Sequence, residues 1–164
     1  LYKRLKHMVL HFYKYAGKVE AARERQDLAS LRQTLIDSMI ICMASANAMN
    51  TSLGKQFSVR AEAATLDALA QELAKDAGIA EDVFVMAGRN LVLLGGKMAK
   101  AIESSDHMEQ GNPRAEMEEL VPALAKAVLS VLGQLPGNLE ASVIERLRGV
   151  EQKSIFADYK PAGH

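Results

Sequence analysis

Apolar residues recur at steps of three and four along most of the chain, the spacing that gathers them on one face of an α-helix. Alternation with a period of two, the pattern of a half-buried strand, does not extend over any useful length. The pattern predicts six helices, at about residues 3–26, 28–50, 61–76, 80–104, 114–134 and 139–155. We therefore expect an all-α fold, an antiparallel helical bundle in which residues 1–164 form a single domain.

The segment 28–50 differs from the others because apolar residues cover nearly all of its faces between Leu35 and Ala46. A helix of this kind belongs at the centre of a bundle. Asp37 lies inside the apolar belt and points away from Leu35 and Ala46. A carboxylate buried there needs a cation, a metal ion or hydrogen-bond donors, whereas the plainer interpretation is an Asp that reaches solvent or pairs with a nearby Lys or Arg.

Glycine and proline interrupt two of the predicted helices. Gly95 and Gly96 lie inside the segment 80–104, where glycine lowers helix stability unless a close backbone approach or a break is needed. We expect a kink near Gly95. Pro122 removes a backbone donor from the segment 114–134, so we expect two helical pieces that meet there at an angle.

Composition places the chain among ordinary globular proteins. Apolar residues make up 49% of the sequence and charged residues 24%, which argues against a disordered chain. The longest apolar run, 39–44, is too short to cross a bilayer, so we expect no membrane partner. A lone Cys42 cannot form an internal disulfide, and no signal-peptide pattern follows the first basic residues. We therefore expect a cytoplasmic protein.

The net charge is zero, which does not favour nucleic acid as a partner, but the charges are unevenly distributed. Residues 3–18 carry basic side chains and no acid, while residues 103–119 are mostly acidic. These segments are either two solvated faces or surfaces that attract each other across a fold or dimer contact.

The common catalytic motifs are absent from the sequence: it has no P-loop, no Gly-x-Gly-x-x-Gly, no Gly-x-Ser-x-Gly and no Cys-x-x-Cys. His7 and His11 are spaced as two metal ligands on one helical face would be. The pair lacks a third ligand nearby in the sequence, so we interpret both as solvated helix residues.

An internal repeat is suggested by two segments, 15–24 and 94–103, which share Gly, Lys, Ala and Glu at a constant offset of 79 residues. They predict duplicated helical hairpins within 1–57 and 80–155, with Lys18 equivalent to Lys97. Four shared residues could also arise by chance among helical sequences, so both interpretations stay open.

The same stretches resemble the MazG-like, all-α nucleoside triphosphate pyrophosphohydrolases, whose acid-bearing segments match 14–18 and 33–37 here. The resemblance implies two fused MazG-like hairpins and acids that hold Mg²⁺ against a nucleotide triphosphate. The positions of those acids read Tyr15, Lys18, Thr34 and Asp37 in the first hairpin and Leu94, Lys97, Glu119 and Pro122 in the second. Only one acid remains in each hairpin.

We therefore expect a divergent MazG-like protein that lacks the usual Mg²⁺-dependent hydrolysis and at most binds a nucleotide or another phosphorylated small molecule. Lys18, Lys97 and Asp37 are the candidate ligand-binding residues. If activity remains, Mg²⁺ is the implied cofactor. The candidate metal ligands are then Asp37, Glu20, Glu24 and Glu119, with Asp27 as a further replacement.

The alternatives are a non-catalytic helical interaction module that forms a homo-oligomer, and an active pyrophosphohydrolase with relocated acids. Their predictions differ at Asp37. Three or more carboxylates converging there favour an enzyme, whereas an isolated Asp37 paired with Lys or Arg favours the module.

Overall fold

The computed structural model describes residues 1–57, 65–77, 82–107 and 111–152. Helices dominate these ranges and no strand occurs in them, which confirms the all-α fold class. The helices are α1 (Tyr2–Glu24), α2 (Leu28–Ala48), α3 (Leu53–Gln56), α4 (Leu66–Ala77), α5 (Val83–Asp106), α6 (Pro113–Leu132) and α7 (Leu139–Gln152). None of them combines the length and the apolar character needed to cross a bilayer.

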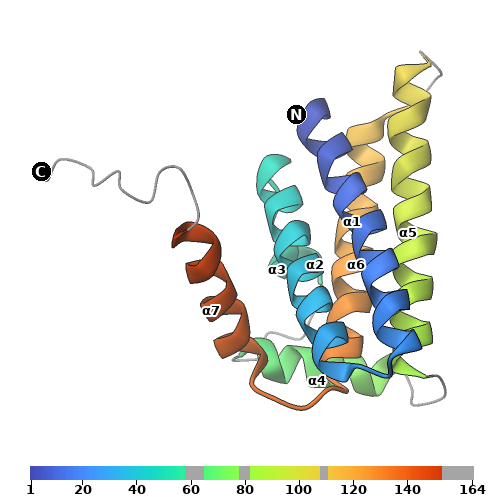
Figure 1. Cartoon of the computed structure of the whole chain (residues 1–164). Coiled ribbons are helices and arrows are strands. Elements are labelled where there is room, and N and C mark those ends of the chain that lie inside the picture. The colour runs from blue at the N-terminus through green and yellow to red at the C-terminus, as the bar shows by residue number, and fades with distance from the viewer. Residues whose placement is uncertain (58–64, 78–81, 108–110, 153–164) are drawn as a thin grey trace, which may run out of the picture.

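Four long helices form an antiparallel bundle (Figure 1). α1 packs against α2 and α5, and α6 packs against α5 and α2, so the four enclose one core. The side chains of Phe12, Leu35, Leu91 and Leu129 are completely buried in it. The apolar stripes of the sequence therefore face one another, as the spacing of three and four predicts.

The N-termini of two bundle helices are capped by aspartates. Asp27 accepts a hydrogen bond from the backbone N–H of Ser30 at the start of α2, and Asp82 does the same for Phe84 and Val85 at the start of α5. Such caps satisfy backbone donors that lack a partner within the helix. They stabilise the point at which the chain enters each new helix.

The basic and acidic segments of the sequence meet at one end of the bundle. Lys6 Nζ lies 2.8 Å from Asp106 Oδ2, and the Tyr2 hydroxyl donates to Asp106 Oδ1 at 2.8 Å. Hydrogen bonds from Lys6 and Tyr2 hold the pKa of Asp106 below its usual value. One pair of opposite charges from the two segments thus meets across the contact between α1 and α5, whereas Lys3, Arg4, Glu116 and Glu119 are exposed to solvent.

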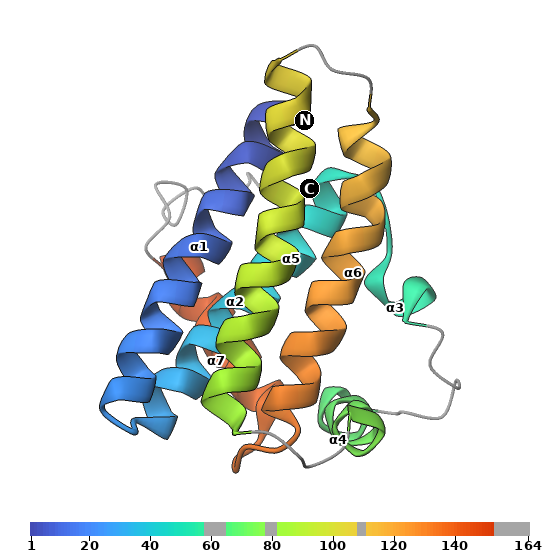
Figure 2. The same cartoon turned by 90° about the vertical axis from the view of Figure 1, so that its right-hand side faces the viewer.

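α4 packs across the C-terminal end of α6, transverse to the long helices of the bundle (Figure 2). The crossing is very close at Gly133, the residue after α6. A Cβ atom there would lie 2.1 Å from the carbonyl oxygen of Ala70 on α4. Only glycine leaves room for this approach of two backbones.

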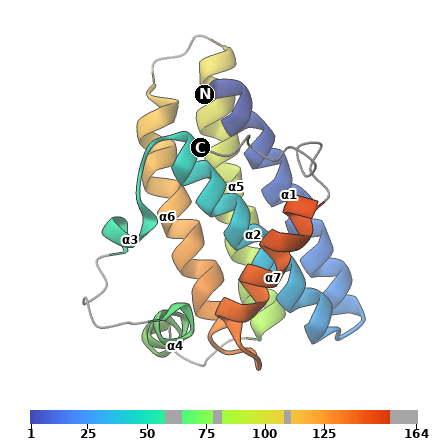
Figure 3. The same ribbon diagram turned by 90° about the vertical axis from the view of Figure 1, so that its left-hand side faces the viewer.

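α7 lies on the outer side of α2, away from the bundle core (Figure 3). Its first turn is attached to α4, because the Asp67 carboxylate accepts hydrogen bonds from the backbone N–H groups of Leu139 (2.7 Å) and Glu140 (3.0 Å). Only Leu139 and Val143 are buried on this helix. α2 consequently lies between α1, α6 and α7, but Ile40, Ile41 and Met43 on its remaining face are only partly buried, so its apolar residues are not covered on all sides.

Several details correct the expectations from the sequence. α6 continues as one helix through Pro122 instead of dividing there, since the adjacent Val121 and Leu124 are fully buried and hold it in the bundle. α5 is likewise one helix through Gly95, where an added Cβ would meet Phe12 of α1 at an ordinary contact distance of 3.9 Å. The short helix α3 was not predicted.

Candidate functional site

Asp37 is the only acid among the buried residues of the described core, and it faces α7 from the outer side of α2. Arg146 of α7 binds it with two hydrogen bonds, from Nε to Oδ1 at 2.6 Å and from Nη2 to Oδ2 at 3.1 Å. The Gln33 amide lies 3.4 Å from Oδ1. This paired geometry raises the pKa of Arg146 above its ordinary value, through hydrogen bonding and then through attraction to the carboxylate.

Tyr15 of α1 lies beside this ion pair and is 5% exposed. Burial raises the pKa of Tyr15 to about 12; the Asp37 charge adds to the rise and Arg146 opposes it. Two ammonium groups flank the phenol ring, with Lys14 Nζ 4.7 Å and Lys18 Nζ 6.0 Å from its centroid. Tyr15 therefore has two ammonium groups beside its ring and also responds to the charges of Asp37 and Arg146.

The two histidines of α1 contact each other on the same side of the helix. His11 Nε2 lies 3.1 Å from His7 Nε2, and His11 Nδ1 lies 2.8 Å from Lys14 Nζ. Partial burial lowers the pKa of His11, and the charges of Lys14 and His7 lower it further. Tyr15 is also close, with its ring centroid 5.8 Å from that of His11.

A small polar pocket of about 290 Å³ separates α2 from α7 next to the ion pair, and its lining includes Arg32, Ser142 and Glu145. Arg32 donates to the Ser142 hydroxyl at 2.9 Å and to the carbonyl of Asn138 at 3.0 Å. Its Nε is buried without a hydrogen-bond partner. Arg32 thus joins Arg146 in attaching α7 to α2.

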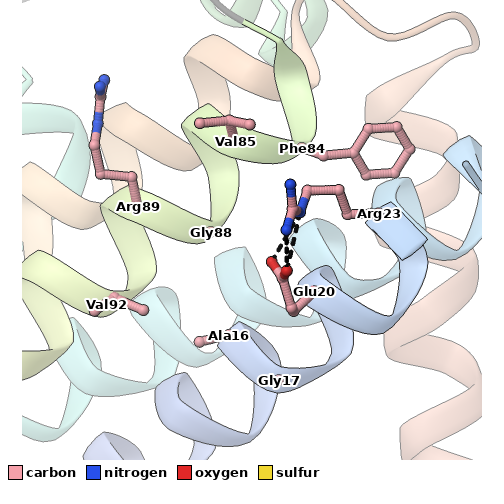
Figure 4. A pocket seen from close by; sticks show the side chains of 9 residues that line it. All are labelled: Ala16, Gly17, Glu20, Arg23, Phe84, Val85, Gly88, Arg89 and Val92. Carbon is pink, nitrogen blue, oxygen red and sulfur yellow. Dashed lines mark hydrogen bonds and ion pairs between the residues drawn. The ribbon is translucent and has the colours of Figure 1, made fainter.

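A larger open groove of about 600 Å³ runs between α1 and α5 (Figure 4). Its floor includes Gly17 and Gly88, and the side chains of Val85 and Val92 border it. Glu20 accepts hydrogen bonds from the Arg23 guanidinium at one edge. The lining is mostly apolar, which suits a protein side chain better than a phosphate.

The structure does not bring the predicted metal ligands together. Glu20 is paired with Arg23, Glu24 is exposed on α1, Glu119 is exposed on α6, and Asp27 caps α2. Within residues 1–57, 65–77, 82–107 and 111–152, no three His, Cys, Asp or Glu side chains converge as a metal site would require.

The two predicted ligand-binding lysines are also on different helices. Lys18 is exposed on α1 near Tyr15, whereas Lys97 is exposed on α5. α7, which carries Arg146, packs on α2 and α4. Of the predicted ligand-binding set, Lys18 and Asp37 are related only through Tyr15, whose ring lies 6.0 Å from Lys18 Nζ and whose pKa is raised by the Asp37 charge.

Reasoning from the sequence missed Arg146 and Tyr15 as the neighbours of Asp37. A signal for Arg146 was present, because Leu139, Val143 and Arg146 follow one another at steps of four and three on the helix. Leu139 and Val143 are the buried residues of α7, so Arg146 shares their side of the helix. No local signal links α7 to α2 across the 109 positions that separate Asp37 from Arg146.

Comparisons with known proteins give no family for this chain. No family model matches it, no curated protein matches it, and no solved structure matches it. The resemblance to MazG-like enzymes therefore stays a prediction that rests on the quoted residues alone.

Proposed function

We propose that this protein is a non-catalytic helical module that associates with a second copy of itself. The observation that carries the non-catalytic part is the pairing of Asp37 with Arg146. If the chain is a divergent MazG-like protein, this guanidinium occupies the place of the metal ion that such enzymes use. The module alternative expected this arrangement, an isolated carboxylate paired with a base.

Electrostatics argue against a dication beside Asp37. Mg²⁺ is held by several oxygen ligands, and a single carboxylate that already accepts two hydrogen bonds from Arg146 offers few of them. The Arg146 guanidinium already places a full positive charge against both carboxylate oxygens, and this charge repels a further cation. Hydrolysis of a nucleotide by the MazG-like mechanism is therefore disfavoured.

A pyrophosphate-release assay tests this first part. Purified protein with each standard nucleoside triphosphate and Mg²⁺ or Mn²⁺ should release no pyrophosphate above background, and Asp37→Ala should behave identically. Turnover by the parent that disappears in Asp37→Ala would contradict the proposal, since it would mean that the carboxylate serves a metal despite Arg146.

The outward side of α1 and α5 supports the self-association part. Large apolar side chains are exposed on these two helices, namely Leu10, Tyr13, Val85, Val92 and Leu93, and two of them, Val85 and Val92, line the groove. The same side exposes the backbone at Gly17, where an added Cβ would meet nothing within 4 Å. In a two-fold symmetric dimer, the same surface of each copy contacts the other copy. Exposed apolar side chains of one copy can then fill the hollow at Gly17 of its partner, and the reverse.

Paired variants test whether this face is the interface. Val92→Glu places a charge beside the groove, at a side chain that is 51% exposed and so is not needed for the core. Sedimentation velocity should show dimer for the parent at about 100 μM and monomer for Val92→Glu. Leu147→Glu, at a 39% exposed position on α7, is the matched control and should stay dimeric. A monomeric parent, or equal effects of both variants, would contradict the proposed face.

A second candidate function is weak, metal-independent binding of a phosphorylated small molecule. The observation that favours it is the group of cations around Tyr15, namely Lys14, Lys18 and Arg146, of which only Arg146 is paired with the Asp37 carboxylate. A ligand bound only by the folded state raises the melting temperature. Lys18→Ala should abolish a shift caused by a nucleotide without metal, while Lys97→Ala on α5 should leave it unchanged; equal shifts in both variants would reject this site.

A further inference from the structure

We propose that His7 and His11 form a two-ligand site for a divalent transition metal ion, Cu²⁺, Ni²⁺ or Zn²⁺, on the surface of α1. The residues are one helical turn apart, and their Nε2 atoms lie 3.1 Å from each other. The ring centroids are 4.7 Å apart with the planes at 85°. The two imidazole nitrogens thus face each other as a hydrogen-bonded pair outside the helix, and a metal ion bound to both would replace that hydrogen bond.

The separation of the two nitrogens fits one shared metal ion. A Zn–N bond is about 2.0–2.1 Å long, so an ion bound to both Nε2 atoms would see them at an angle of roughly 100°. That angle lies between those of square-planar and tetrahedral coordination. Imidazole suits Cu²⁺, Ni²⁺ and Zn²⁺, whereas Mg²⁺ prefers oxygen, so this site is chemically distinct from the one sought at Asp37.

The helix holds the pair in place and leaves it accessible. Val9 and Phe12, on the other side of α1, are buried in the bundle core, so this turn of the helix is anchored. His7 is exposed and His11 is partly exposed. The described residues supply no third His, Cys, Asp or Glu at this point, so water or an incoming ligand would complete the coordination.

Lys14 allows a test in which a substitution is expected to strengthen metal binding instead of weakening it. An ammonium group has only donors, so Lys14 donates to Nδ1 of His11, and the ring proton of His11 then lies on Nε2. A metal ion on Nε2 requires that proton to move to Nδ1, and Lys14 must then withdraw. Lys14 is exposed and free to do so, but its contact and its charge both oppose the metal.

Replacing Lys14 by Glu should therefore strengthen metal binding. A carboxylate in this position can accept the Nδ1–H of a metal-bound His11, as the partners of metal-ligating histidines commonly do. Removing an adverse contact and adding such a partner should raise the affinity about tenfold. A merely structural role of Lys14 would leave the affinity unchanged.

Isothermal titration calorimetry of the full chain with Cu²⁺, Ni²⁺, Zn²⁺ and Mg²⁺ tests the site. We expect one transition-metal ion per chain, no Mg²⁺ binding, and at least a roughly tenfold loss in each of His7→Asn and His11→Asn. The matched control is the double variant His107→Asn/His164→Asn, which removes the other two of the four histidines and should bind as the parent does.

Three outcomes would overturn the proposal: no binding of Cu²⁺, Ni²⁺ or Zn²⁺ by the parent at about 100 μM, unchanged binding in His7→Asn and His11→Asn, or equal loss in the control variant. Circular dichroism of each variant establishes that its helices are intact. Failure of this test would leave the proposed module function unaffected, because neither histidine takes part in it.

Discussion

Arg146 is the residue on which the docking of α7 depends most directly. Its removal leaves the Asp37 carboxylate, with a side chain 11% exposed, without its cation. Breaking a fully buried pair costs about 3–5 kcal/mol, and because the Arg146 side chain is 38% exposed we expect about 1–3 kcal/mol for Arg146→Ala in urea unfolding. Asp37→Ala should cost less, since the remaining guanidinium can reach solvent.

The double variant Asp37→Ala/Arg146→Ala separates this electrostatic cause from simple loss of packing. Without the carboxylate, truncation of Arg146 should be less destabilising than it is in the parent, so the two effects should not add. Strict additivity would mean that the pair contributes no coupling and that Arg146 acts only through its contacts.

Of the Asp37–Arg146 pair, the buried carboxylate could be predicted from the sequence and its partner could not. Helical angles alone placed Asp37 inside an apolar belt, and the burial of the residue agrees with the need for a partner that was inferred from it. The identity of that partner depends on where α7 packs, which is a property of tertiary structure. Local patterns could not choose Arg146 among the many Lys and Arg side chains of the chain.

At the scale of helices, Gly133 sets how closely α4 can cross α6. Gly133→Ala would place a methyl group 2.1 Å from the backbone oxygen of Ala70, where no flexible side chain can yield. We expect a loss of about 1–3 kcal/mol in the free energy of unfolding, measured with urea. Gly149→Ala on α7 is the control, since its added Cβ meets nothing within 4 Å and should be neutral or stabilising. Equal behaviour of the two variants would contradict the close crossing.

Asp67 makes the attachment of α7 to α4 dependent on pH. Backbone hydrogen bonds from Leu139 and Glu140 lower the pKa of Asp67 below its ordinary value. A carboxyl group whose pKa is lower in the folded state stabilises the fold above its unfolded pKa, about 3.9, and loses this contribution as the pH falls through the folded pKa.

The comparison of the parent with Asp67→Asn isolates this contribution. Between about pH 5 and pH 3 the parent should lose more unfolding free energy than the variant, because the amide of the variant does not titrate in this range. Urea unfolding of both proteins at each pH measures the difference. Equal losses would mean that the other carboxyl groups with lowered pKa values, such as Asp27 and Asp106, account for acid sensitivity.

The helices could be predicted where burial is one-sided and continuous. The stripe containing Phe12 and Val19 predicted α1, because each apolar residue of such a stripe faces the core. Pro122 misled the prediction, since tertiary packing of Val121 and Leu124 compensates for one missing backbone hydrogen bond. α3 was not predicted, because a helix of four residues is too short to show a periodic pattern of apolar residues.

At the scale of the whole molecule, the bundle consists of two hairpins, α1 with α2 and α5 with α6. This arrangement is compatible with the proposed duplication. The connections differ, however, because residues 25–27 join the first pair and residues 107–112 the second, so a single offset cannot align both helices of each hairpin. The internal repeat stays a prediction, and a superposition with Gly17 over Gly96 would test it.

If two copies associate through the groove, one substitution at Gly17 should have two opposite effects. It should stabilise the monomer and weaken the association. Gly17 lies within α1, where glycine is less favourable than alanine by about 0.5–1 kcal/mol, and an added Cβ meets nothing within 4 Å. Gly17→Ala should therefore raise the free energy of unfolding of the monomer. The same methyl group enters the floor of the groove between α1 and α5, so it should weaken association of two copies several-fold.

Urea unfolding at low protein concentration measures the first effect, and sedimentation equilibrium measures the second. Gly149→Ala provides the matched control, because it adds a methyl group to an equally open helical glycine on α7, outside the groove. It should gain stability without a change in association. If Gly17→Ala instead gains stability and associates as tightly as the parent, the hollow at Gly17 is not part of the contact, and the interface must lie elsewhere on the molecule.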